Sequence, residues 1–344
     1  MTDTSTHPTE PSRPVHTVLV AGATGFVGKR LLHELARAGF AVVGTSRHPE
    51  EARGAFPAVE FRRMDVTDAA STVEAMKGCD AAVYLVHSMA DGKDYADVEA
   101  TSATAFRDAA TQAHLSRVVY LGGIRPRGSV SRHLKSRLHT GEILRSGTVP
   151  TIELQATMII GGGGESWRMV RDLAARLPFM LLPRWLDSES QPVAVDDVVH
   201  AIAHCLGPEM SQMTSHVYTL PGPETLAARE ILRRTARLLG SDPRMLRVPF
   251  VTPRLSSYWI RLVTRADRHV AVELVEGLRS DIVSTDDGFW RLVPDYRRSS
   301  FDEAARRALG EEERGLSFGA RMTERFLRSF PGSRKTGRPA PSGS

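Results

Sequence analysis

The chain has 344 residues, of which 41% are hydrophobic and 25% charged, and its formal net charge is +5. This composition is typical of a soluble globular protein, and the apolar runs are far too short to span a bilayer, which argues against an integral membrane protein. Basic residues are interleaved with acidic ones along the chain, so we expect a mildly basic surface and no nucleic-acid partner.

The two ends of the chain have the composition of disordered segments. Residues 1–14 lack the apolar core of a secretory signal, and residues 331–344 are rich in Gly, Pro, Ser and basic side chains. The two cysteines, Cys79 and Cys205, are far apart and form no Cys-x-x-Cys pair, so we expect no disulfide framework. These features predict a cytoplasmic protein with a disordered leader and a disordered tail.

Strand and helix patterns alternate from residue 16 onward. Residues 16–21 form a short, β-branched, nearly continuous apolar run, which is typical of a strand covered on both faces. After Gly25, Leu31 and Leu35 share one helical face, and Gly39 stands where a glycine commonly ends a helix. We expect a polar loop after the second strand, further strands at 40–46, 59–66, 80–88, 116–123 and 150–160, and further helices at 68–79, 97–115 and 136–147.

Strands separated by helices of this length require right-handed crossovers between parallel neighbours. The pattern therefore predicts an α/β protein of the Rossmann type, in which helices cover both faces of a doubly wound parallel sheet.

A glycine-rich turn, Gly22-Ala23-Thr24-Gly25-Phe26-Val27-Gly28, separates the first strand from the first helix. The first glycine permits a tight turn, the second lets a phosphate approach the backbone, and the third lets the helix pack close to the strand. The N–H groups and the partial positive charge of the helix N-terminus favour an anion at this place. We predict a cradle for a dinucleotide pyrophosphate, formed by Gly22, Thr24, Gly25, Phe26, Val27 and Gly28.

The ends of the second and third strands indicate which dinucleotide is bound. An NAD site usually carries an acidic residue at the end of the second strand, whereas this chain has Ser46 and Arg47 there. A guanidinium can pair with a 2′-phosphate, so we expect NADP(H), with NAD(H) as the alternative. Asp65 suits a hydrogen bond to the adenine amino group, with the Val66 backbone beside it.

These residues also have simpler interpretations. Arg47 could be a solvated surface residue, and Asp65 could cap the following helix, although Asp68 is better placed for that role. Val86, in the expected fourth strand, completes the set of predicted cofactor contacts.

The order of these segments resembles the short-chain dehydrogenase/reductase superfamily. The resemblance rests on the glycine turn followed by RMDVTD, YLVHSM, RVVYLGG and HLKSRLHTGEILR, and it covers about residues 15–240. More narrowly, the chain resembles the atypical, NmrA-like branch of NAD(P)-binding proteins that are related to nucleoside-diphosphate-sugar epimerases. The resemblance implies a Rossmann domain at 15–160 and a smaller, mainly helical C-terminal part at 161–330, partly interleaved with the sheet, on the substrate side.

The site of chemistry departs from this family. Members with ordinary reductase activity carry Tyr-x-x-x-Lys, in which the lysine lowers the pKa of the tyrosine that exchanges a proton with the substrate carbonyl. This chain has His133 and Arg137 at the corresponding place, and Gly122 and Gly123 where the family has a serine on the fifth strand. We predict His133 as the acid or base, with its pKa lowered by Arg137, and Arg137 as a holder of the nicotinamide ribose.

Three further features have no single interpretation. His200 and His204 lie one helical turn apart, but they have no third ligand in view, so we expect no metal site. The glycine run 161–164 either passes the nicotinamide or is a flexible connector. Residues 250–283 could line an apolar substrate pocket or make peripheral contact with a membrane.

Two functions stay open at this point. The first is an NADP(H)-preferring oxidoreductase that acts on a small-molecule carbonyl, quinone or sugar nucleotide. The second is a dinucleotide-binding redox sensor or assembly factor without catalysis. The loss of Tyr-x-x-x-Lys favours the second and the large C-terminal part favours the first, whereas the oligomeric state is left open.

Overall fold

A computed structural model describes most of the chain, namely residues 14–87, 95–126, 130–176, 179–182, 184–241, 244–247, 281–284 and 286–315. The expected disordered tail, nearly all of the expected leader and most of the segment 250–283 lie outside these residues. Across the described ranges, none of the helices has the length and the apolar character needed to cross a membrane.

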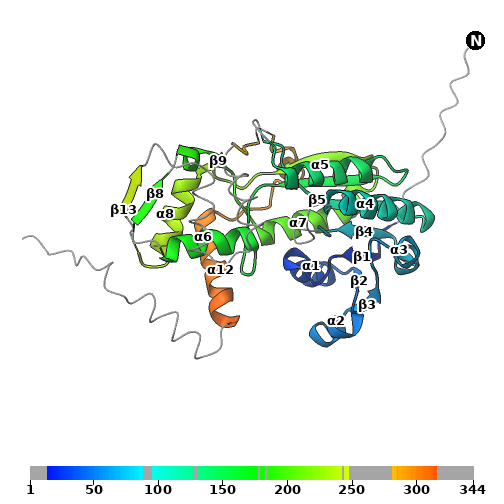
Figure 1. The fold of residues 1–344 in the computed structure, drawn as a ribbon. Helices are drawn as coiled ribbons and strands as arrows, with labels where there is room; N and C mark the ends of the chain where they lie inside the picture. Colours follow the sequence, from blue (N-terminus) through cyan, green and yellow to red (C-terminus); the bar gives the residue numbers. More distant parts are fainter. Residues whose placement is uncertain are drawn as a thin grey trace, which may run out of the picture.

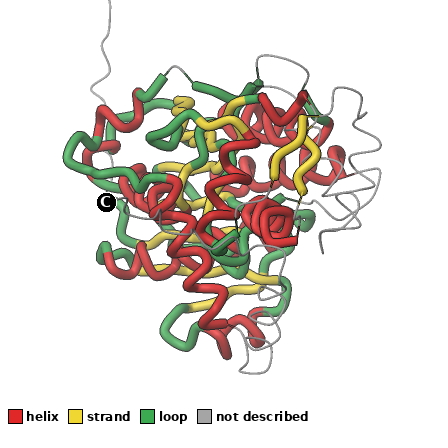
Figure 2. Tube along the Cα trace, turned by 90° about the vertical axis from the view of Figure 1, so that its left-hand side faces the viewer, coloured by secondary structure: helices red, strands yellow, loops and turns green. Residues whose placement is uncertain are grey.

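The centre of the molecule is a sheet of seven parallel strands, enclosed by helices on both sides (Figure 2). Its strands are β1 (Thr17–Ala21), β2 (Ala41–Ser46), β3 (Glu60–Arg63), β4 (Ala81–Tyr84), β5 (Arg117–Gly123), β6 (Thr151–Ala156) and β11 (His216–Leu220). They lie in the order β11-β6-β5-β4-β1-β2-β3, and every pair of neighbours is parallel. The predicted doubly wound parallel sheet is confirmed, and its order reverses between β1 and β4, where such sheets bind ligands.

Helices cover both faces of this sheet (Figure 1). The helices α3 (Ala69–Met76), α4 (Tyr95–Gln112) and α5 (Arg132–Arg145) share one hydrophobic core, and α1 (Phe26–Arg37), α2 (Pro49–Ala55) and α7 (Val195–Leu206) share the other. Alternate residues of β1 enter the two cores: Val18 and Val20 face α1 and α7, while Leu19 and Ala21 face α3 and α4. A strand covered on both faces needs this nearly continuous apolar run.

The remaining described elements belong to the C-terminal part of the chain. The helices α6 (Glu165–Arg176), α8 (Ala228–Leu238) and α12 (Phe301–Gly315) pack around a third core that includes Trp167, Ile231, Phe301 and Ala305. Three two-stranded pairs accompany them: β7 (Ile159–Ile160) with β10 (Val193–Ala194), β8 (Phe179–Leu182) with β13 (Arg244–Arg247), and β9 (Glu189–Ser190) with β12 (Leu226–Ala227). The short helices are η2 (Arg184–Asp187), η3 (Pro208–Met210) and α11 (Gly288–Leu292).

Three expectations about local structure are wrong. The expected strand at 150–160 is split, because the chain leaves the main sheet after β6 and Thr157 donates a hydrogen bond to the carbonyl of Gln191 (2.5 Å). The expected polar loop after β2 contains helix α2, which has Pro49 in its first turn, where proline is favoured. Helix α5 begins at Arg132 rather than at 136, because the side chain of Ser131 accepts a hydrogen bond from the backbone N–H of Leu134 (3.3 Å).

Candidate active site

The glycine turn between β1 and α1 has the geometry of a backbone cradle. Gly22 has a φ of +83°, a left-handed conformation that favours glycine, and the N–H of Gly25 donates to its carbonyl (3.0 Å). A Cβ on Gly28 would lie 2.2 Å from that carbonyl oxygen, so only glycine lets α1 start this close to β1. A Cβ on Gly25 would lie 3.2 Å from the same oxygen and would stand at the N-terminus of α1. The residues therefore fit a phosphate that approaches bare backbone.

A cavity of about 530 Å³ joins this turn to the predicted catalytic pair. It opens at the carboxyl ends of β1, β4, β5 and β6, which is the ligand-binding edge of such a sheet. The predicted residues that line it are Gly22, Gly25, Phe26, Val27, Gly28, His133 and Arg137. Much of the remaining wall is apolar and includes Leu85, Leu121, Ile124, Leu134 and Ile159.

The other predicted cofactor residues lie outside the lining of this cavity. Thr24 is exposed in the glycine turn, and Val86 is half-buried just after β4. Ser46 and Arg47 stand at the end of β2, where Arg47 is exposed and makes no hydrogen bond or ion pair within the described part of the chain. Half-buried Val66 comes shortly after β3.

Asp65 lies near two arginines, at the ends of β2 and β3. The backbone N–H and the hydroxyl of Thr67 donate to its carboxylate (3.0 and 2.7 Å). These hydrogen bonds lower the pKa of Asp65 below its ordinary value, and the positive charges of Arg47 and Arg63 add to the shift. The helix-capping alternative for Asp65 does not hold, because Asp68 accepts the N–H of Ala70 at the start of α3 (3.0 Å).

Arg137 is held at the end of β5 by backbone groups. Its Nη2 donates to the carbonyl of Leu121 (2.8 Å), and its own carbonyl accepts the hydroxyl of Tyr120 (2.9 Å). Its Nε is buried and has no hydrogen-bond partner among the described residues. A half-buried guanidinium with an unused donor on the wall of a cavity suits a polar group of a bound molecule.

His133 stands one helical turn before Arg137 on α5 and faces His87 across 6.3 Å between ring centroids. Burial lowers the pKa of His133 to about 3, and the positive charge of Arg137 and the neighbouring His87 add to the shift. The direction agrees with the expectation from sequence, although burial rather than Arg137 is the largest cause. At neutral pH the ring is therefore uncharged and can donate one N–H hydrogen bond, but it does not carry an extra proton.

His87 is a site residue that the sequence reasoning missed. It follows β4 at the edge where ligands bind, and its side chain lines the cavity. The pKa of His87 is lowered to about 4, again by desolvation first and by Arg137 second. The signal was present in YLVHSM, because a polar side chain directly after a buried strand at the switch point is a candidate contact.

The two glycines that replace the strand-five serine lie close to neighbouring side chains. A Cβ on Gly122 would lie 2.7 Å from the carboxylate of the buried Glu153, and a Cβ on Gly123 would lie 2.8 Å from the side chain of Leu134. A serine at either position would require its neighbour to move. The side chains of Glu153 and Leu134 therefore lie where a serine side chain would stand.

The predicted glycine run 161–164 follows β7, and Gly163 and Gly164 line the cavity. A Cβ on Gly164 would lie 2.9 Å from the ring of Phe26, so the run packs tightly against the glycine turn. This contact favours the interpretation of the run as a wall of the site over that of a flexible connector.

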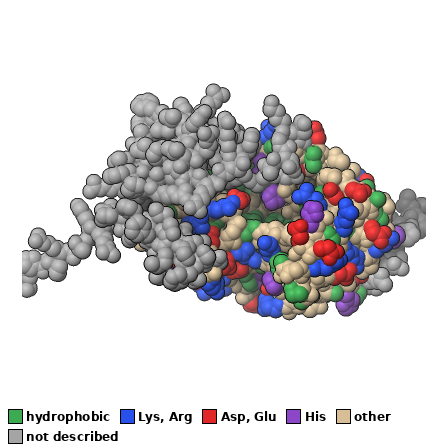
Figure 3. Space-filling view, turned by 60° about the horizontal axis from the view of Figure 1, so that its bottom comes forward, with side chains coloured by type: hydrophobic (Ala, Val, Ile, Leu, Met, Phe, Trp, Pro, Cys, Tyr) green, Lys and Arg blue, Asp and Glu red, His purple; other side chains and the backbone are tan. Residues whose placement is uncertain are grey.

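The two histidines of α7 form no metal site in the part of the chain that the structure describes. Over the residues that the structure describes, His, Cys, Asp and Glu side chains form no cluster that could hold a metal ion, and the ring of His200 stacks on Tyr296 (centroids 3.8 Å apart). On the face drawn in Figure 3, Lys and Arg side chains are interspersed with Asp and Glu in the coloured region.

Comparisons with known proteins agree with this geometry. Residues 22–148 match the model of a family described as NAD(P)H-binding. Over 111 residues the chain is 31% identical to cinnamoyl-CoA reductase 1 of Oryza sativa subsp. japonica, a match that covers 30% of this chain and 33% of that protein. The chain thus spans about a third of the length of this curated relative.

Solved structures share the fold over most of this chain. A nucleoside-diphosphate-sugar epimerase from Staphylococcus aureus has a TM-score of 0.69 at 14% identity, covering 85% of this chain and 99% of its own. The triphenylmethane reductase of Citrobacter sp., complexed with NADP(H), has a TM-score of 0.65 at 16% identity, with coverages of 85% and 99%. The UDP-glucose 4-epimerase of Thermus thermophilus, in complex with NAD, has a TM-score of 0.53 at 18% identity, with coverages of 76% and 99%.

The match over residues 22–148 and the fold shared with these structures agree with the sequence resemblance to NAD(P)-binding proteins of the short-chain dehydrogenase/reductase type. The narrower NmrA-like assignment stays a prediction.

Proposed function

We propose that the chain is an oxidoreductase that prefers NADP(H). The observation that carries the proposal is the cavity that joins the glycine turn to His133 and Arg137 at the switch point of the sheet. The glycine turn would hold the pyrophosphate, and the buried Nε of Arg137 would donate to the nicotinamide ribose. The bound dinucleotide would supply or accept a hydride.

The preference for NADP(H) rests on the arginines at the ends of β2 and β3. Arg47 and Arg63 both lie near Asp65, and they would pair with the 2′-phosphate. Asp65 would accept a hydrogen bond from the adenine amino group, beside the backbone of Val66 and Ser46. With Thr24 and Val86, these residues are the proposed contacts of the cofactor outside the cavity.

The apolar wall of the cavity favours a carbonyl or quinone with an apolar body over a sugar nucleotide. His133, which is uncharged at neutral pH, would donate its N–H to the substrate oxygen on which negative charge develops. Because His133 holds no extra proton, the oxygen would take its proton from water that enters the cavity.

A redox sensor or assembly factor without turnover is the second candidate. Two observations favour this candidate. The lowered pKa of His133 leaves it without an extra proton to give to a substrate. Neighbouring side chains lie close to Gly122 and Gly123, where the family has a serine hydroxyl. Such a protein would bind the dinucleotide in the same cradle and use its state as a signal.

The test is a titration of the purified full-length chain with NADPH and NADH, followed by steady-state NADPH oxidation with a panel of quinones, aldehydes and UDP-sugars. We expect tighter binding of NADPH and oxidation with an apolar carbonyl or quinone. Equal affinities would contradict the NADP(H) preference, and tight binding without turnover on any acceptor would favour the second candidate. A chain that binds neither dinucleotide has neither function.

A further inference from the structure

Three consecutive glutamates, at 311–313, lie near the C-terminal end of α12. The C-terminal end of a helix has a partial negative charge, so carboxylates are locally unfavourable there. Two of them have cationic partners on other helices: Glu311 contacts Arg30 of α1 (2.5 Å), and Glu312 contacts Arg171 of α6 (2.6 Å). The positions of these carboxylates are therefore explained by tertiary contacts and not by the stability of α12 itself.

Both carboxylates also reach the glycine run 161–164. Oε2 of Glu311 accepts the backbone N–H of Gly162 (3.1 Å), and Nη2 of Arg30 donates to the carbonyl of the same residue (2.9 Å). Oε1 of Glu312 accepts the N–H of Gly163 at the longer distance of 3.5 Å. The Glu311–Arg30 pair thus holds the backbone N–H and the carbonyl of Gly162. Glu311 lies 149 positions from Gly162 in the sequence, and Arg30 lies 132 positions from it.

The same arginine holds the glycine turn that begins α1. Nη1 of Arg30 donates to the carbonyl of Phe26 (3.1 Å), and the guanidinium carbon lies 4.8 Å from the centre of the Phe26 ring. That ring packs on the run, because a Cβ on Gly161 or Gly164 would lie 3.0 or 2.9 Å from it. Phe26 and Gly164 both line the cavity. Arg30 therefore links the two backbone segments that form this side of the cavity.

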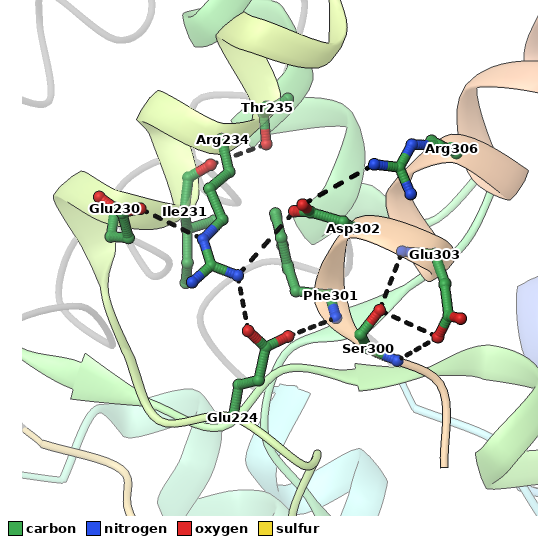
Figure 4. Close-up of polar contacts among 10 residues, drawn as sticks. All are labelled: Glu224, Glu230, Ile231, Arg234, Thr235, Ser300, Phe301, Asp302, Glu303 and Arg306. Carbon is green, nitrogen blue, oxygen red and sulfur yellow. Dashed lines mark hydrogen bonds and ion pairs between the residues drawn. The ribbon is translucent and has the colours of Figure 1, made fainter. Parts of the chain in front are cut away.

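Helix α12 is anchored at its other end as well (Figure 4). Ser300 and Glu303 form a capping box, in which the hydroxyl of Ser300 accepts the N–H of Glu303 (3.3 Å) and the carboxylate of Glu303 accepts the N–H of Ser300 (2.8 Å). Glu224 accepts the next N–H of the helix, from Phe301 (2.8 Å), and pairs with Arg234 of α8 (2.6 Å). The carboxylate of Glu311 is therefore presented by a helix that is secured to the C-terminal core.

We propose that Glu311 and Arg30 are positioning residues of the dinucleotide site: through them α12 sets the position of the glycine run against Phe26, and so the shape of the cavity where the nicotinamide half binds. The inference rests on the proposed function. It concerns only this half, because Gly163 and Gly164 line the cavity while Arg47 and Asp65, at the ends of β2 and β3, do not.

The test compares a whole dinucleotide with its adenine half. Glu311→Gln keeps the size of the side chain but removes its charge, and it should raise the Kd for NADPH about two- to tenfold, the range expected of one partly exposed charged contact. The Kd for adenosine 2′-monophosphate, which lacks the 5′-phosphate and therefore does not reach the glycine turn, should stay unchanged, because this fragment contacts only the ends of β2 and β3. Arg30→Gln should act alike, and the double variant should fall short of the product of both effects.

Arg306→Gln is the matched control, since it removes an exposed charge of α12 that contacts only Asp302 of the same helix among the described residues (3.9 Å). It should leave both Kd values unchanged. The inference would be overturned if Glu311→Gln bound NADPH as tightly as the wild type, or if its affinity for the adenine fragment fell as much as its affinity for NADPH. Either result would leave the proposed function standing. Wild-type protein that fails to bind NADPH would overturn the proposed function and the inference together. Melting temperatures show whether Glu311→Gln or Arg30→Gln is unfolded. If either is unfolded, Arg30→Lys, which keeps the positive charge but removes the planar guanidinium, is measured in its place.

Discussion

The two sides of the cavity differ in the groups that line them. The β1–α1 side is glycine backbone, where Gly22 and Gly28 leave no room for side chains. The β4–α5 side is made of ionisable side chains, with His87, His133 and Arg137 brought together by the ends of two elements. The backbone cradle depends on the glycine geometry and on the N–H groups at the start of α1, whereas the imidazoles depend on burial and on a nearby charge. In the proposed function, pyrophosphate binding and proton chemistry would therefore fall on different sides of the cavity, and substitutions on either side can test that.

The largest effect is expected from Gly25→Val. The new side chain would stand at the N-terminus of α1, 3.2 Å from the Gly22 carbonyl at its Cβ, where the phosphates would approach. Binding of NADPH and NADH should both be lost, as measured by fluorescence titration. The melting temperature should change little, because Gly25 is exposed and not part of the core. Retained affinity for either dinucleotide would contradict the cradle.

On the other side of the cavity, His133→Ala should lower turnover while leaving the dinucleotide Kd unchanged. The loss of one preorganised donor to a developing oxyanion costs about 10²–10³ in kcat. In the wild type, kcat/KM should show no inflection from His133 between pH 5 and 8, because its pKa lies near 3. An inflection near neutrality that disappears in His133→Ala would identify it as a proton carrier. Unchanged turnover would leave His133 with a structural role only.

A smaller effect is expected at the far end of the dinucleotide. Arg47→Ala removes a guanidinium that lies near Asp65 and should weaken NADPH binding by about 1–3 kcal/mol, the usual value of a charged hydrogen bond. NADH affinity should not change, so the ratio of the two Kd values is the quantity to measure. Arg63→Ala should have part of the same effect. If NADPH and NADH weaken equally, Arg47 supports the fold rather than the choice of cofactor.

The difference between the two sides also explains what sequence could predict. The glycine turn is a contiguous stretch of sequence. The spacing of its three glycines, between an apolar run and a helix, was therefore enough to predict the positions of Gly22, Gly25 and Gly28 in the cradle. The strands followed for the same reason, since burial on both faces leaves a continuous apolar run such as 17–21. Helix α2 was missed although Pro49 at its start was a usable signal.

The other side depends on contacts between distant segments. Nothing near His133 in sequence shows that His87 lies beside it or that burial would lower its pKa to about 3. The break after β6 depends on Thr157 bonding to Gln191, and the hold on Gly162 comes from a helix that begins beyond residue 300. Such features follow from packing, which a single sequence without its fold does not reveal.

The smallest effect, and the most direct test of the electrostatics at His133, is the dependence of stability on pH. The pKa of His133 is about 3 in the folded protein and 6.5 in its ordinary state, so the unfolded chain binds the proton more tightly between these values. Stability should therefore fall as the pH is lowered through 6.5 towards 3, and it should be unaffected by this group above 6.5. His87, whose pKa is about 4, acts in the same direction. Melting temperatures between pH 7 and pH 5, above the range where most carboxylates titrate, should fall more steeply in the wild type than in His133→Gln. Equal slopes in the two proteins would show that the His133 ring is solvated, and the uncharged hydrogen-bond donor of the proposed mechanism would lose its basis.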